Sequence, residues 1–121
     1  MACVLIVDDD RDTRESLQDI LVGEGYDVRL AASGGEALAF LRGEERPAII
    51  LLDDMMPQMT GEQVLDWMRA HPQFDGVPTV LISGDIRPAP HARATAVLRK
   101  PFSIDDLLEI ARRYCGPCPR G

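Results

Sequence analysis

Four short apolar runs dominate the pattern of hydrophobic and polar positions, and each run stops at a polar residue. The central run, residues 48–52, is followed directly by two aspartates. An apolar run of this length, rich in branched side chains, is typical of a strand buried on both faces of a sheet. Similar runs occupy residues 3–7, 79–82 and 96–98. The sequence therefore predicts four strands whose carboxyl ends carry polar side chains.

A fifth strand and several helices follow from other periodicities. Residues 27–31 alternate polar and apolar side chains, as a strand at the edge of a sheet does. Apolar residues at helical spacing predict four helices, which begin near Asp10 or Asp12, Ser33, Gln63 and Ser103. Strands that alternate with helices through short loops imply a parallel sheet with helices on both faces.

The order of the strands determines where their polar ends meet. Because the second strand has an edge pattern and crossovers are right-handed, we expect a doubly wound five-stranded parallel α/β sheet of order 2-1-3-4-5. The switch point then lies between the first and third strands, where Asp8, Asp9 and Asp53 converge. Ser83 and Lys100 follow the fourth and fifth strands. Carboxylates, a hydroxyl and an ammonium together suit a divalent cation and a phosphoryl group.

Composition narrows the classes of function. The 121 residues are 45% hydrophobic and 27% charged, which is typical of one globular domain. A formal net charge of −7 argues against direct binding of nucleic acid, which requires a basic surface. No apolar run approaches membrane-spanning length, and no signal peptide is evident. Three cysteines fit a reducing compartment, so we expect a cytoplasmic protein.

Four motifs follow one another in a recognisable order. They occupy residues 4–10, residues 51–53 with Met56-Pro57 and Gly61, residues 78–84, and residues 100–102. Together they resemble the receiver domain of response regulators, the phosphoacceptor module of two-component signalling, which has a flavodoxin-like fold. The resemblance covers residues 2–114, so we expect a receiver domain over residues 1–114 and a flexible tail over residues 115–121.

The resemblance implies a role for each acidic residue. Asp53 corresponds to the phosphoacceptor of the family. Asp9 corresponds to a direct ligand of Mg²⁺, and Asp8 to one that acts largely through water. The backbone carbonyl of Met55 corresponds to a further ligand. Such domains are not enzymes with an external substrate, because their only chemistry is self-catalysed phosphotransfer and slow autodephosphorylation.

The resemblance also implies partners. Ser83 and Lys100 would contact the phosphoryl group, and the Lys100-Pro101 peptide is cis in the family. A histidine kinase or a histidine phosphotransfer protein would donate the phosphoryl group, and a downstream protein that the sequence does not identify would receive the signal.

Two alternatives remain open. Asp54 competes with Asp53, but neighbouring side chains of a strand point to opposite faces, so we expect only one to reach the site, and the apolar run favours Asp53. The second alternative is a pseudo-receiver that binds partners without phosphorylation. It is favoured by Val97, where the family usually has an aromatic residue, and by prolines in residues 84–94, which predict a short or absent fourth helix.

Other residues have plainer interpretations. Residues 115–118 have the sequence of the thioredoxin redox motif, but they follow a helix instead of opening one, so we predict no redox role for Cys115 and Cys118. His71 and His91 lie beside prolines and are interpreted as solvated turn residues. Trp67 falls outside the apolar face of its helix and is interpreted as a surface or interface residue.

Overall fold

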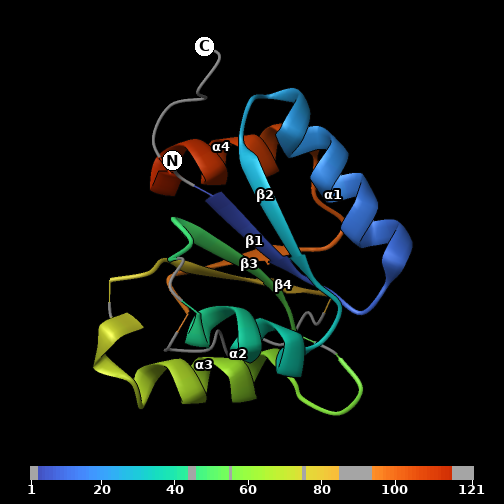
Figure 1. The fold of residues 1–121 in the computed structure, drawn as a ribbon. Helices are drawn as coiled ribbons and strands as arrows, with labels where there is room; N and C mark the ends of the chain where they lie inside the picture. Colours follow the sequence, from blue (N-terminus) through green and yellow to red (C-terminus); the bar gives the residue numbers. More distant parts are fainter. Residues whose placement is uncertain (1–2, 44–45, 55, 75, 85–93, 116–121) are drawn as a thin grey trace.

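Five parallel strands form the centre of the molecule. The computed structural model describes residues 3–43, 46–54, 56–74, 76–84 and 94–115. The strands form one sheet in the order β2-β1-β3-β4-β5, which confirms the prediction (Figure 1). Their bounds are β1 Cys3–Val7, β2 Asp27–Ala31, β3 Ile49–Asp53, β4 Thr79–Ser83 and β5 Ala96–Arg99.

Helices cover both faces of the sheet, as predicted. Figure 1 shows α1 and α4 over one face and α2 and α3 over the other. The helices are α1 Arg11–Gly23, α2 Gly34–Arg42, α3 Gly61–Arg69 and α4 Ile104–Cys115, and a short 3₁₀ helix, η1, spans Pro72–Phe74.

The two core layers follow from the period of the strands. In β1, Val4 and Ile6 pack into the layer beneath α1 and α4, whereas Leu5 and Val7 pack into the layer beneath α2 and α3. All four side chains are buried, because successive residues of a strand alternate between two covered faces. Burial on both faces explains why the run over residues 3–7 is uniformly apolar.

Caps determine where the helices begin. The Thr60 hydroxyl accepts a hydrogen bond from the Gln63 backbone N–H, and the Gln63 side chain accepts one from Thr60 N–H, so α3 begins two residues before the predicted start. Ser33 caps α2 in a similar way. Asp10 occupies the N-cap position of α1, but its carboxylate accepts a hydrogen bond from the Thr13 hydroxyl at 2.6 Å instead of capping the helix backbone.

The connection between β4 and β5 was predicted to hold a short helix or none. Its residues 85–93 lie outside the described part of the chain, whereas Ala94 and Thr95 are described and are not helical. Thr95 pairs with Thr79 through two hydrogen bonds of 2.8 and 2.9 Å, which fix the entry into β5. Within the described ranges, no helix has the length and apolar character needed to span a membrane.

His71 lies in a bend before Pro72, in agreement with our interpretation of it as a turn residue, but its side chain is only partly exposed to solvent. Its ring stacks on Trp67 with 4.0 Å between the ring centroids, and its Nδ1 lies 2.7 Å from the Trp67 backbone oxygen. Phe74, the last residue of η1, lies against the same indole ring, with 5.4 Å between the ring centroids. Trp67 is therefore half-buried against the second core layer. His91 lies outside the described residues.

Gly61 gives a test of the packing between β3 and α3. A Cβ atom at Gly61 would lie 2.6 Å from the Asp53 backbone oxygen and 2.9 Å from Leu81 Cδ1. We expect Gly61→Ala to lower the free energy of unfolding by about 1–3 kcal/mol, and the melting temperature by roughly 3–12 °C, because the backbone must shift.

Gly23→Ala is the matched control, because a Cβ atom at Gly23 meets nothing within 4 Å. Thermal melts followed by circular dichroism measure both variants. A melting temperature of Gly61→Ala equal to that of wild type would contradict the close approach.

Candidate functional site

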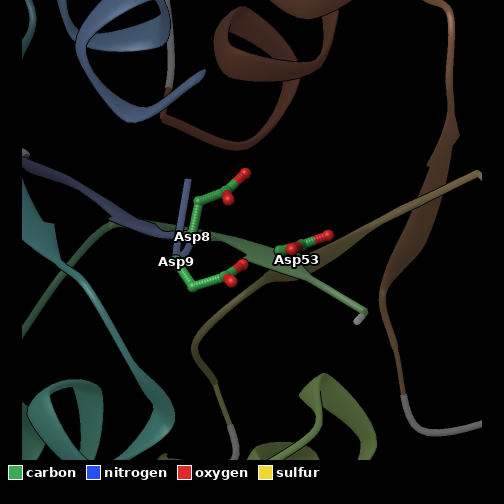
Figure 2. Close-up of side chains that lie close together, drawn as sticks. All are labelled: Asp8, Asp9 and Asp53. Carbon is green, nitrogen blue, oxygen red and sulfur yellow. The ribbon is translucent and has the colours of Figure 1, made fainter. Parts of the chain in front are cut away.

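Three carboxylates meet at the carboxyl ends of β1 and β3. The register pairs Val7 of β1 with Leu52 of β3, so Asp8 and Asp9 emerge beside Asp53. One carboxylate oxygen from each of the three lies within 4.8 Å of the others. Figure 2 shows the three side chains close together at these strand ends. The structure therefore brings together the acidic residues that the sequence predicted to converge.

Asp8 is the most deeply buried of the three. Its side chain is buried, and its Oδ1 accepts a hydrogen bond from the Asp10 backbone N–H at 2.9 Å. Its Oδ2 is buried and has no hydrogen-bond partner among the described residues. Loss of solvent on burial raises the pKa of Asp8, against the lowering effect of the Asp10 N–H. A buried carboxylate in this condition is costly unless a cation approaches it.

These residues fit a magnesium ion. Mg²⁺ is bound in proteins by one or two carboxylates together with water and substrate phosphate oxygens. Asp8 Oδ2 offers a buried acceptor, Asp53 a second buried carboxylate, and Asp9 an exposed one. Met55, whose backbone carbonyl was predicted as a further ligand, lies outside the described residues, so its role stays a prediction.

Lys100 places a cation next to Asp53. Its Nζ lies 3.6 Å from Asp53 Oδ1, and its backbone N–H donates to the Ser83 carbonyl at 2.9 Å. The Lys100-Pro101 peptide is cis, as the resemblance implied. Asp53 is thus a buried carboxylate close to a lysine ammonium and to two further carboxylates.

Ser83 ends β4 with its side chain buried. Its hydroxyl donates a hydrogen bond to Asp54 Oδ2 at 3.3 Å. We predicted that only one of the two adjacent aspartates reaches the site, and Asp53 is indeed the one in the acidic cluster. The half-buried Asp54 nevertheless contacts a predicted site residue, because β3 ends at Asp53 and strand alternation no longer applies beyond it. Sequence reasoning missed this contact.

Cys115 lies in a helix and not in the predicted tail. It is the last residue of α4 and packs, half-buried, against the first core layer. Burial and, to a lesser extent, the nearby Cys3 raise the pKa of the Cys115 thiol to about 11. A thiol used for redox chemistry has a lowered pKa, so this finding agrees with the interpretation that Cys115 has no redox role. Cys118 lies outside the described residues.

A groove between α1 and α4 is separate from the acidic cluster. It has a volume of about 310 Å³, and an exposed Ile104 lies at its edge. Its lining is mainly apolar and comprises Asp12, Thr13, Ser16, Leu17, Ile20, Phe102, Ile104 and Leu107. None of the clustered carboxylates lines this groove.

Comparison with known proteins identifies the family. The sequence model of the response regulator receiver domain family matches residues 4–112 of this chain. The chain belongs to the response regulator receiver domain family. This confirms the resemblance drawn from the four sequence motifs.

Curated relatives of this receiver domain include longer proteins. The chain is 36% identical over 115 residues to the response regulator Rre1 of Synechocystis sp., covering 90% of this chain and 49% of Rre1. It is 31% identical over 117 residues to an uncharacterised 14.6 kDa protein of Leptolyngbya boryana, of which it covers 88%. The chain thus spans about half the length of Rre1 and most of the smaller relative.

Solved structures agree with the fold. The chemotaxis protein CheY4 of Vibrio cholerae superposes with a TM-score of 0.86 at 34% identity, covering 94% of this receiver domain and 98% of that chain. The response regulator TrrA of Thermotoga maritima, solved in complex with Mg²⁺ and BeF, gives a TM-score of 0.82 at 28% identity, with 94% and 99% covered. The flavodoxin-like fold of this chain is therefore that of the receiver family.

The buried charge of Asp8 predicts an effect on stability. In EDTA, we expect Asp8→Asn to raise the melting temperature by roughly 3–8 °C, because it removes a buried charge from a cluster of like charges. Millimolar Mg²⁺ should raise the melting temperature of wild type and have much less effect on Asp8→Asn. Differential scanning calorimetry measures both effects. Asp19→Asn, which changes an exposed carboxylate of α1, should respond to Mg²⁺ as wild type does.

The same variant has a predicted pH dependence. Because the pKa of Asp8 is raised in the folded state, protonation of Asp8 stabilises the fold. This contribution to the free energy of unfolding is lost as the pH rises through the folded-state pKa. The advantage of Asp8→Asn in EDTA should therefore be largest near pH 7 and shrink as the pH falls towards about 4. An advantage that grows on acidification would contradict the assignment.

Proposed function

We propose that this receiver domain is a phosphorylation switch that accepts a phosphoryl group on Asp53. The observation that carries the proposal is the closeness of this buried carboxylate both to the Lys100 ammonium, 3.6 Å away, and to the carboxylates of Asp8 and Asp9. The donor is a histidine kinase or a histidine phosphotransfer protein, and the compartment is the cytoplasm. The net charge of −7 over these 121 residues makes direct binding of nucleic acid by this domain unfavourable, so the domain itself would signal through contact with protein.

The chemistry requires one nucleophile and neutralisation of charge around it. An oxygen of the Asp53 carboxylate forms a bond to phosphorus while the bond from phosphorus to the donor histidine breaks, and the histidine nitrogen keeps the electron pair. Asp8, Asp9 and Asp53 would hold a Mg²⁺ ion, which would supply positive charge near the phosphoryl oxygens. Lys100 supplies a further positive charge next to Asp53, and Ser83 offers a hydroxyl proton to a phosphoryl oxygen.

The product differs from the starting state mainly in charge. The acyl phosphate carries close to two negative charges, whereas the Asp53 carboxylate that it replaces carries one. This added charge shifts an equilibrium between two conformations only if the phosphoryl group interacts more favourably with the protein in the conformation that binds the partner. Ser83 and Lys100 are the described residues placed to make that difference, because one ends β4 and the other follows β5.

A pseudo-receiver that binds partners without phosphorylation is the second candidate. The observation that favours it is Val97, a small half-buried side chain of β5 that packs against the second core layer. The resemblance implies that receiver domains usually have an aromatic residue at this position, whose side chain changes position on phosphorylation and so alters the surface. A receiver with valine there either transmits phosphorylation to its surface by another route or binds its partners without being phosphorylated.

Direct phosphorylation separates the two candidates. Wild type, Asp53→Asn and the control Asp19→Asn would be incubated with acetyl phosphate and Mg²⁺ and examined by intact mass. We expect one phosphate-sized adduct on wild type and on Asp19→Asn, none on Asp53→Asn, and none on any of them in EDTA. No adduct on wild type, together with no binding of beryllofluoride, would favour the pseudo-receiver.

Lys100 gives a second test of the site. We expect Lys100→Ala to slow adduct formation from acetyl phosphate by about tenfold to a hundredfold, because a cation next to the transferring group is lost. Its affinity for Mg²⁺ should stay equal or increase, because the ammonium no longer competes for Asp53. Arg99→Ala removes a neighbouring exposed charge and is the matched control. Equal rates for Lys100→Ala and Arg99→Ala would exclude a role for the ammonium.

A further inference from the structure

The Ser83 hydroxyl points to a residue outside the acidic cluster. Its side chain is buried at the end of β4, and its hydroxyl donates to Asp54 Oδ2 at 3.3 Å. Asp54 follows the phosphoacceptor directly. The hydroxyl expected to contact a phosphoryl group is therefore already engaged by the neighbour of Asp53.

The backbone fixes the position of Asp54. Its N–H donates to the Ile82 carbonyl at 3.0 Å, and its carbonyl accepts from the Gly61 N–H at 3.1 Å. A Cβ atom at Gly61 would lie 3.1 Å from Asp54 Cα, so the start of α3 packs closely against this residue. The position of Asp54 relative to Ser83 thus follows from the contacts of β3 with β4 and α3.

Two acceptors compete for one proton. A serine hydroxyl carries a single proton to donate, so Ser83 cannot fully serve both Asp54 and a phosphoryl group on Asp53. An O–H···O contact of 3.3 Å is longer than the usual range, which makes it weak enough to exchange. We propose that Asp54 is a positioning residue, which holds the Ser83 hydroxyl in the unphosphorylated state and must release it when Asp53 is phosphorylated. This role rests on the proposed function.

Asp54 also carries a negative charge next to the phosphoacceptor. Any neutral replacement should favour an anionic ligand by removing repulsion, whether or not Ser83 is involved. The positioning role is distinguished by its dependence on Ser83. The hydroxyl must be present for the release of Ser83 to matter, whereas repulsion acts equally without it.

A double-mutant cycle separates the two effects. The dissociation constant of beryllofluoride, a mimic of the phosphoryl group, would be measured by calorimetry at saturating Mg²⁺. The proteins are wild type, Asp54→Ala, Ser83→Ala and the double variant. Asp54→Ala should lower the dissociation constant of beryllofluoride in both backgrounds. We expect the fold-change to be about threefold to tenfold larger when Ser83 is present than when it is replaced by alanine, because one exchanged hydrogen bond contributes about that much.

Asp54→Asn is the conservative variant. It removes the charge but keeps an oxygen acceptor of the same shape, so its coupling to Ser83 should be smaller than that of Asp54→Ala. If Asp54→Ala fails to fold by circular dichroism, Asp54→Leu, which keeps the size of the side chain without an acceptor, takes its place in the cycle.

The outcomes distinguish this role from the function on which it rests. Wild type that binds beryllofluoride, with equal effects of Asp54→Ala in both backgrounds, would overturn the positioning role and leave the proposed function intact. Wild type that neither binds beryllofluoride nor accepts phosphate would overturn both. A coupling of the expected size, weakened in Asp54→Asn, would establish Asp54 as the residue that positions Ser83.

Discussion

The concentration of negative charge at the ends of β1 and β3 is the constraint on which the site depends. Asp8 and Asp53 are buried, and Asp9 adds a third carboxylate within reach of both. Two carboxylates about 4 Å apart repel by roughly 4 kcal/mol at an effective dielectric constant of about 20. The apolar strands on either side must hold this arrangement together, and Lys100 offsets only part of the repulsion from a half-exposed position. A cation bound among the three carboxylates would relieve this repulsion.

The interior of the sheet explains how the chain tolerates such a cluster. β1 and β3 are buried along their whole length, and their side chains alternate between two core layers. The burial of so much apolar surface is the main source of stability, and the carboxylates lie only at its edge. Function is thus placed where the strands end, as in other open parallel sheets.

The fold and the acidic cluster could be predicted from sequence because both depend on short-range patterns. Uniform apolar runs identify buried strands, an alternating run identifies the edge strand, and strand order then brings Asp8, Asp9 and Asp53 together. The contact between Ser83 and Asp54 could not be predicted, because it depends on the path of the chain after β3. The stacking of His71 on Trp67 was also missed, although the two residues are four apart at the end of α3, a spacing that brings side chains together on one side of a helix.

The central claim is that Asp53, and not its neighbour Asp54, becomes phosphorylated. Reduction of the phosphorylated protein with borohydride converts an aspartyl phosphate into homoserine, which peptide mass spectrometry locates to a single residue. The burial of Asp53 close to Lys100 and within the cluster of carboxylates predicts homoserine at residue 53 alone. Homoserine at residue 54, or at both positions in similar amounts, would contradict the account.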